Sequence, residues 1–199
     1  MNRERPNLLF YGGASIFDVL ESQKQKVKDA VAALNENYVL NVSEEDLVQS
    51  LIAEHTLHVP VIKEADIHVA DHREASVDVS GDPMRMIMDR SRPFHVPGST
   101  TIIAVPFDGD SGFFKVQPQT YNLNPPRADV VPDELHLSYT TVEPNPERIK
   151  MEYLQTVQQI KEHLTWLRSS VDQFHAQLES LSSKRCGIAR RASSPMPAR

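Results

Sequence analysis

Four histidines within 18 residues are the part of this sequence best suited to metal chemistry: His55, His58, His68 and His72. His68 and His72 flank Asp71, and on a helix their spacing would bring the two imidazoles together. The residues around them alternate between apolar and polar types, which predicts a β-strand instead. Four residues of strand span roughly 13 Å, whereas each ligand of a zinc ion lies about 2.0–2.1 Å from it. The spacing therefore favours histidines on a polar strand face over a metal site built from His68 and His72.

A second candidate is the segment FDGDSG, which resembles the first half of a calcium-binding loop because Asp108 and Asp110 are two residues apart. The later ligand positions do not fit. Phe113 and Phe114 stand where oxygen ligands are needed, and no glutamate closes the loop. The segment is therefore predicted to be a turn.

The remaining short motifs predict no catalytic residues and no cofactor or metal site. Gly12-Gly13-Ala14-Ser15 precedes a predicted helix but lacks the Lys-Ser/Thr ending of a P-loop and the three-glycine spacing of a dinucleotide-binding turn. Cys186 is the single cysteine, so no internal disulfide can form, and no base is placed beside it. Nucleophile-elbow, H-E-x-x-H and C-x-x-C motifs do not occur.

Charge is distributed unevenly along the 199 residues, whose net charge is −6. The stretch 184–199 contributes +5, which leaves −11 on the preceding body. An acidic body repels phosphate backbones, so nucleic-acid binding by the folded part is not expected. Because no apolar run approaches the roughly 18 residues of a membrane span and no secretory signal is present, we expect a cytoplasmic protein without a membrane partner.

The elements that would position these residues fall into two groups. Residues 15–36 and 43–54 have apolar residues at helical spacing, with Ser15 and Ser43 as N-caps and Asp18 completing a capping box. From residue 57 the apolar period changes to two, which predicts up to six short strands. The clearest hairpin joins 100–105 to 113–116, and residues 83–88 (PMRMIM) are predicted to form a short helical turn.

The strongest pattern lies in residues 146–183, which follow the good N-cap Asn145. Their apolar residues keep a period of 3.5 over four heptads, as in a coiled coil or a packed helix pair. We name this set the heptad stripe: Tyr153, Val157, Ile160, Leu164, Leu167, Val171, Phe174, Leu178 and Leu181. The predicted fold is α+β, with N-terminal helices packed on a mostly antiparallel meander sheet, followed by one long heptad-patterned helix. The predicted domains are an α+β domain (1–143), the long helix (144–183) and a disordered basic tail (184–199).

The long helix is expected to extend past its own domain. At 1.5 Å per residue it measures roughly 57 Å. A compact domain of about 140 residues, the size of the part before the helix, is only about 35–40 Å across. Some other surface should therefore cover the far end of the heptad stripe. Three covers are open: the helix at 15–36, a second copy of the chain, or a different partner or domain. The residues expected to make this contact are Leu164, Leu167, Val171, Phe174, Leu178 and Leu181.

One family resemblance covers roughly residues 97–185. The run VPGSTTIIAVPFDGDSGFFKVQPQTYNLNPPRADVVPDELHLSY, followed by a long helix with Trp166-Leu167, Asp172 and Phe174, resembles a bacterial module. Such modules stand N-terminal to effector domains, such as nuclease or TIR domains, in prokaryotic defence-type proteins. The resemblance implies a long helix that leads into an effector, and it brings no catalytic motif with it.

Taken together, these patterns predict a non-catalytic regulatory or protein-interaction module that associates through its long C-terminal helix, with itself or with another protein. Two alternatives remain open at this level. One is a metal-dependent hydrolase that uses histidine and aspartate from residues 55–72 and 108–110. The other is a small-molecule sensor with a pocket between the sheet and the helices.

Overall fold

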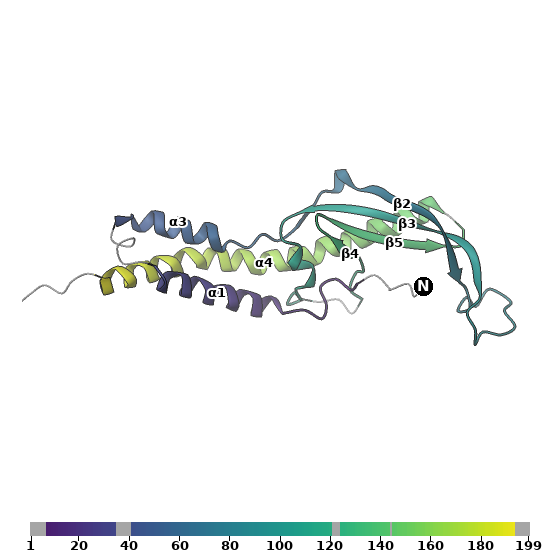
Figure 1. The fold of residues 1–199 in the computed structure, drawn as a ribbon, viewed down its shortest axis with the longest axis horizontal. Helices are drawn as coiled ribbons and strands as arrows, with labels where there is room; N and C mark the ends of the chain where they lie inside the picture. The colour runs from purple at the N-terminus through teal and green to yellow at the C-terminus, as the bar shows by residue number, and fades with distance from the viewer. Residues whose placement is uncertain (1–6, 35–40, 121–123, 144, 194–199) are drawn as a thin grey trace, which may run out of the picture.

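One long helix runs along most of the molecule, with the N-terminal helices beside one half of it and the sheet beside the other (Figure 1). The computed structural model describes residues 7–34, 41–120, 124–143 and 145–193, without the side chains of residue 44 and residues 179–193. The helices are α1 (Ile16–Ala32), α3 (Glu44–His55) and α4 (Pro146–Ser193), and two 3₁₀ helices are η1 (Glu64–Asp66) and η2 (Ser111–Lys115). The strands are β1 (Val61–Ile62), β2 (His68–Asp78), β3 (His95–Asp108), β4 (Asp129–Val131) and β5 (Glu134–Thr141). The α+β class is confirmed.

Both N-terminal helices begin at the predicted caps. The Ser15 hydroxyl accepts from the Asp18 amide at 3.2 Å, and the Ser15 amide donates to the Asp18 carboxylate at 3.3 Å, which completes the capping box. At α3, the Ser43 hydroxyl accepts from the Asp46 amide at 3.0 Å. These bonds satisfy backbone N–H groups that have no partner inside the helix.

The five-stranded sheet is antiparallel and is built around β3. β1 and β2 both pair with β3, whose other neighbour is β5, and β4 pairs with β5 at the far edge. The predicted hairpin between 100–105 and 113–116 is wrong, because residues 111–115 form the 3₁₀ helix η2. The hairpin partner of β3 is β2, and the loop between these two strands is 79–94.

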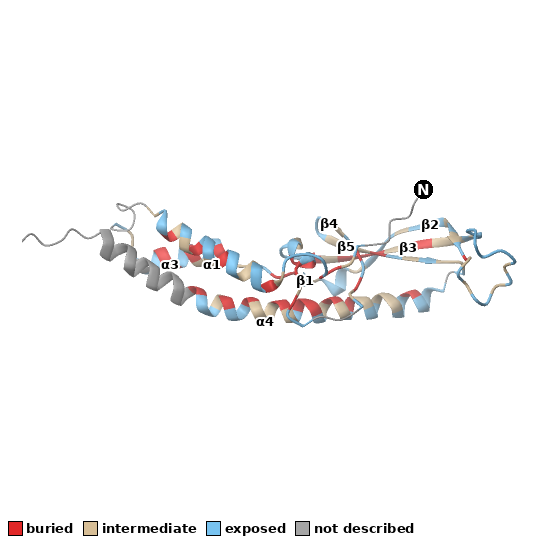
Figure 2. Ribbon diagram, turned by 90° about the horizontal axis from the view of Figure 1, so that it is seen from below, coloured by how far each residue is buried: buried red, intermediate tan, exposed pale blue. Residues whose placement is uncertain are grey.

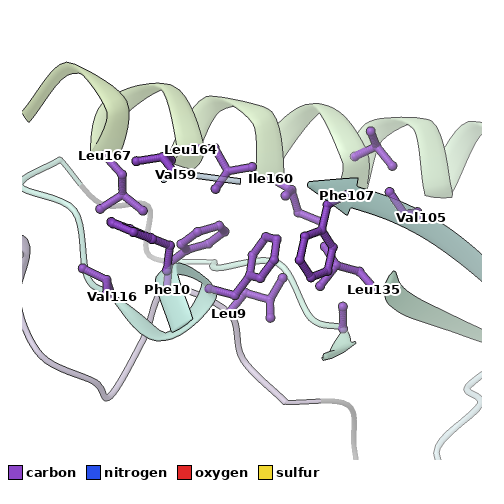
Figure 3. Packing of buried hydrophobic residues seen from close by; sticks show 14 of the residues in the cluster. Leu9, Phe10, Val59, Val105, Phe107, Val116, Leu135, Ile160, Leu164 and Leu167 are labelled. Atoms are coloured by element: carbon purple, nitrogen blue, oxygen red, sulfur yellow. The ribbon is translucent and has the colours of Figure 1, made fainter. Parts of the chain in front are cut away.

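The first half of α4 covers one face of the sheet. The main core joins strand residues such as Val105 and Leu135 to Ile160 and Leu164 of α4, and Figure 3 shows this packing at close range. The Tyr139 hydroxyl also donates to the Thr156 hydroxyl of α4 at 3.3 Å.

The second half of α4 packs on the two N-terminal helices instead. Val27 of α1 contacts Phe174 and Leu178 of α4, and a separate cluster joins Val31 to the α3 residues Leu47, Val48 and Leu51. The N-terminal helices are expected to lie on the sheet, but only the first turns of α1, at Ile16, Val19 and Leu20, reach the main core. Figure 2 shows the buried positions of α4 facing the sheet along one half and α1 with α3 along the other.

The long helix is therefore part of the body and not an appendage after residue 143. It also continues to Ser193, ten residues beyond the predicted end, and passes through Gly187. A glycine inside a helix costs only about 1 kcal/mol relative to alanine, so it need not end one. The predicted disordered tail thus begins with helical backbone, and residues 194–199 lie outside the described part of the chain. Within that part, no helix is both long and apolar enough to cross a bilayer.

Candidate functional site

The heptad stripe is covered by the chain's own elements. Leu164, Leu167 and Val171 belong to the main core with the sheet, and Phe174 and Leu178 pack on α1. All five are almost completely buried. The side chain of Leu181, the sixth expected contact residue, lies outside the described residues. Of the three covers that the sequence left open, the structure supplies the intramolecular one, so these five side chains are not a free docking surface.

The histidines of the first candidate site are dispersed. His68 pairs with Ala104 and His72 with Thr101, three residues apart on β3, so their side chains project from opposite faces of the sheet. A bulge between Val69 and Asp71 produces this change of face. His72 instead bonds the Thr101 hydroxyl at 2.9 Å. Among the described residues, no group of three or more His, Cys, Asp or Glu side chains is arranged to hold a metal ion.

The structure does bring together residues far apart in sequence at the junction between the sheet and the helices. A cleft of about 470 Å³ lies there, which we name the junction cleft. Its titratable lining residues are His58, Asp108, Arg168, Asp172 and His175. Two of these, His58 and Asp108, belong to the set that the hydrolase alternative used, and the other three come from α4. Acidic and basic groups are mixed in this cleft, so it has no single charge preference.

A close backbone approach forms one wall of the junction cleft. The Asp110 amide donates to the His58 carbonyl at 2.9 Å, which draws the end of β3 against the segment after α3. Gly109 sits in this contact with a φ of +115°, and a Cβ there would lie 2.9 Å from the Pro60 Cα. Only glycine combines that φ with that closeness. On the other side, the Arg168 guanidinium donates to the Pro60 carbonyl at 2.9 Å and ties α4 to the same segment.

His175 is the titratable group of the cleft whose state is best defined. Its Nε2 accepts a hydrogen bond from the Leu57 amide at 3.0 Å, so this nitrogen is unprotonated and the imidazole is neutral. Partial burial lowers the pKa of His175 below its ordinary value, and nearby His58 lowers it further, while the Asp172 carboxylate opposes both. Protonation would break the bond to Leu57 that joins α4 to the end of α3.

This arrangement predicts that the free energy of unfolding decreases as the pH is lowered, because His175 becomes protonated. The folded chain holds its pKa below the ordinary value near 6.5. The unfolded chain therefore binds more protons as the pH falls through that value, and the stabilisation present above it is lost. The His175→Gln variant keeps an acceptor for the Leu57 amide but cannot titrate. Urea unfolding of both proteins at pH 7.5 and 5.5 should show a larger loss for the wild type, and equal losses would contradict the assignment.

A different surface lies at the far end of the β2–β3 hairpin. The loop 79–94, here called the tip loop, projects from the end of the sheet (Figure 1). Met84, Met86 and Met88 are essentially fully exposed, at 91%, 104% and 107% of the reference area. The intervening Arg85 and Ile87 are half-buried. The three methionines thus alternate with less exposed residues along the tip loop, and we name them the methionine ridge.

Hydrogen bonds hold the shape of the tip loop. The Arg90 guanidinium donates to three backbone carbonyls, those of Ser80 (3.2 Å), Asp82 (3.0 Å) and Arg85 (2.8 Å). At the base, the Asp78 carboxylate accepts from the Ser80 amide at 2.9 Å and from the Phe94 amide at 3.1 Å. The hydrogen bond from Ser80 is the main reason that the pKa of Asp78 lies below its ordinary value. The ridge is therefore presented on an ordered frame.

Comparison with known proteins identifies no relative whose residues could be compared with those of the junction cleft or the methionine ridge. No family model, curated protein or solved structure matches the chain. The function must therefore be inferred from the residues of this chain themselves.

The sequence contained a signal for the methionine ridge that a helical interpretation obscured. Residues 83–88 are predicted to form a short helical turn, whereas the structure has a hydrogen-bonded turn from Asp82 to Arg85 followed by irregular backbone, and no helix there. Met84, Met86 and Met88 are spaced by two, which matches an extended segment and not a helix. The cleft residue His175 had no local signal, because its partner Leu57 lies 118 residues away.

Proposed function

We propose that this chain is a non-catalytic protein-interaction module whose docking surface is the methionine ridge. The observation that supports this proposal is the near-complete exposure of Met84, Met86 and Met88 side by side. Contiguous exposed apolar side chains are unusual on a monomer and mark interaction sites. Methionine is well suited to such a site, because its flexible, polarizable side chain adapts to the shape of a partner.

The expected contact is weak and reversible unless the partner adds polar bonds. Burying a methionine side chain is worth about 1.5–3 kcal/mol, and ordering it costs up to about 2 kcal/mol. Three methionines thus leave only a few kcal/mol, whereas a micromolar complex needs about 8 kcal/mol. The Arg90 frame reduces the remaining ordering cost, because the backbone of the loop is already held.

A partner protein with an apolar groove and an acidic rim fits the charge of the tip loop. Arg85, Arg90 and Arg92 outnumber Asp82 and Asp89, so the loop is basic on a chain whose net charge is −6. The side chain of Arg92 is 87% exposed, although it lies 3.9 Å from Asp89. An anionic lipid surface would attract the loop but repel the acidic body, so a protein is favoured over a membrane.

This proposal moves the docking surface from the heptad stripe to the other end of the molecule. The five expected contact residues with described side chains are buried inside the chain, whereas the three ridge side chains are almost fully exposed. The proposal retains the role that the family resemblance implies. In that role α4, about 72 Å long at 1.5 Å per residue, separates the ridge from an effector domain joined at its far end.

A photo-crosslinker placed at position 86 tests the proposal in cells of the source organism. We expect one discrete protein conjugate, because this position lies at the centre of the ridge. Its yield should fall at least about tenfold when Met84 and Met88 are also changed to glutamine, since each change removes apolar contact area. A crosslinker at Met151, an exposed methionine on α4, is the matched control and should give no such conjugate.

Two results would count against the proposal. One is a set of conjugates that is the same at positions 86 and 151. The other is co-sedimentation of the chain with vesicles of phosphatidylcholine and phosphatidylglycerol, lost in the Met84→Gln, Met86→Gln, Met88→Gln variant. That outcome would assign the ridge to a lipid surface.

A further inference from the structure

We infer that the methionine ridge is also an oxidation site, at which a peroxide converts the docking surface from apolar to polar and so releases the partner. This inference rests on the proposed function, because it concerns the regulation of the same surface. It adds a modification site and a chemical class of reactant, a two-electron oxidant such as hydrogen peroxide.

The chemistry is an oxygen transfer to each thioether. A lone pair of the methionine sulfur attacks one oxygen of hydrogen peroxide, an S–O bond forms and the O–O bond breaks. The departing hydroxide takes up the proton of the transferred oxygen and leaves as water. The thioether is oxidised to a sulfoxide by two electrons and the peroxide is reduced. Methionine sulfoxide reductases reverse the change, with one enzyme for each sulfoxide epimer.

Access favours this reaction at the ridge. A dissolved oxidant must reach the sulfur atom to react with it, and the three ridge side chains are the most exposed large apolar residues of the described chain. Exposures of 91%, 104% and 107% leave all three side chains open to solvent. An oxidant therefore reaches each of them without any opening of the fold.

The core of the described residues holds no methionine that the same oxidant could modify. Within the described residues, no methionine is buried: the buried apolar side chains are aliphatic residues, alanine and phenylalanine. Oxidation of a core methionine would introduce a polar group and destabilise the protein, but here the core has no such target. The Arg90 frame is also unaffected, because it bonds backbone carbonyls and not sulfur. Among the described methionines, the response is therefore confined to the surface.

The effect on binding is large because the three sulfoxides are adjacent. A sulfoxide is polar, and burying it in an apolar groove without a hydrogen-bond donor removes about tenfold or more of the affinity at each position. Three such groups weaken an already reversible contact to the point of release. Reduction restores the thioethers and with them the apolar surface.

The test exposes the full chain to increasing hydrogen peroxide and follows two quantities. Peptide mass spectrometry locates the sulfoxides, and retention on a phenyl-agarose column measures the apolar surface. We expect residues 84, 86 and 88 to oxidise before Met151, and retention to fall to that of the Met84→Gln, Met86→Gln, Met88→Gln variant. That variant should show no further shift on oxidation, and treatment with sulfoxide reductases of both epimer specificities should restore the retention of the wild type.

Two outcomes would overturn the inference: oxidation of Met151 as early as the ridge, or an equal shift of wild type and triple variant on oxidation. The crosslinking experiment separates this failure from failure of the proposed function. If oxidised protein still forms the position-86 conjugate at full yield, the switch is wrong and the docking surface stands. If no conjugate forms before oxidation, the docking surface itself is wrong.

Discussion

Replacement of Leu167 by alanine should lower the free energy of unfolding by about 2–5 kcal/mol, the usual cost of a leucine-to-alanine change in a packed core. Leu167 has no exposed area and lies where α4 meets the main core, beside Phe10 and Val59 in Figure 3. The cost combines the lost apolar transfer with the cavity that remains. Urea denaturation followed by circular dichroism measures it.

The matched control for Leu167→Ala is Leu154→Ala on the same helix. Leu154 is 47% exposed, so the same chemical change should cost well under half as much. Repeating the unfolding over a hundredfold range of protein concentration adds a second test. If the chain itself covers the heptad stripe, the midpoint does not move. A midpoint that rises with concentration would show that a second copy shares the cover.

The parts of the fold that could be predicted are those set by neighbouring residues. The cap at Ser15 and its bond with Asp18 depend on four consecutive residues, and the structure contains both. The heptad pattern of α4 likewise shows in its spacing alone, and the buried positions follow it from Val157 to Leu178. Local chemistry decides these features, so a sequence is enough to find them.

The parts that could not be predicted depend on which elements meet. A stripe with a period of 3.5 requires a cover, but it does not identify one. Here two different surfaces cover the stripe: the sheet up to Val171, and α1 from Phe174 onward. The junction cleft could not be predicted for the same reason, because its bonded residues Arg168 and Pro60 are 108 residues apart in the sequence. The face of His68 was also beyond prediction, because it depends on one bulged residue in β2.

The alternating pattern of the methionine ridge is visible in the sequence, but its exposure to solvent could not be predicted from the sequence. The alternation of methionine with Arg85 and Ile87 is typical of an extended segment with two sides. Which side faces solvent depends on the frame that Arg90 makes with three carbonyls. An alternating apolar segment of this kind is more often the inner side of a strand, so only the structure distinguishes a surface from a core position.

The segment after β3 offers the largest contrast between the predicted and the observed fold. If residues 113–116 were a strand, Phe113 and Phe114 would point to opposite faces and at least one would be near solvent. In η2 both are buried. The centroid of the Phe114 ring lies 4.8 Å from the centroid of the Phe107 ring and 5.9 Å from that of the Phe10 ring. The turn of the 3₁₀ helix allows adjacent rings to enter one core.

Phe113→Ala and Phe114→Ala should therefore each lower the free energy of unfolding by about 3–5 kcal/mol, as expected for buried phenylalanines. Phe17→Ala on α1 is the control, since Phe17 is 59% exposed, and it should cost less than about 1 kcal/mol. Denaturant titration of the three variants measures the differences. A large cost at only one of the two positions would support a strand at 113–116 instead of η2, because a strand buries one side chain and leaves the next in water.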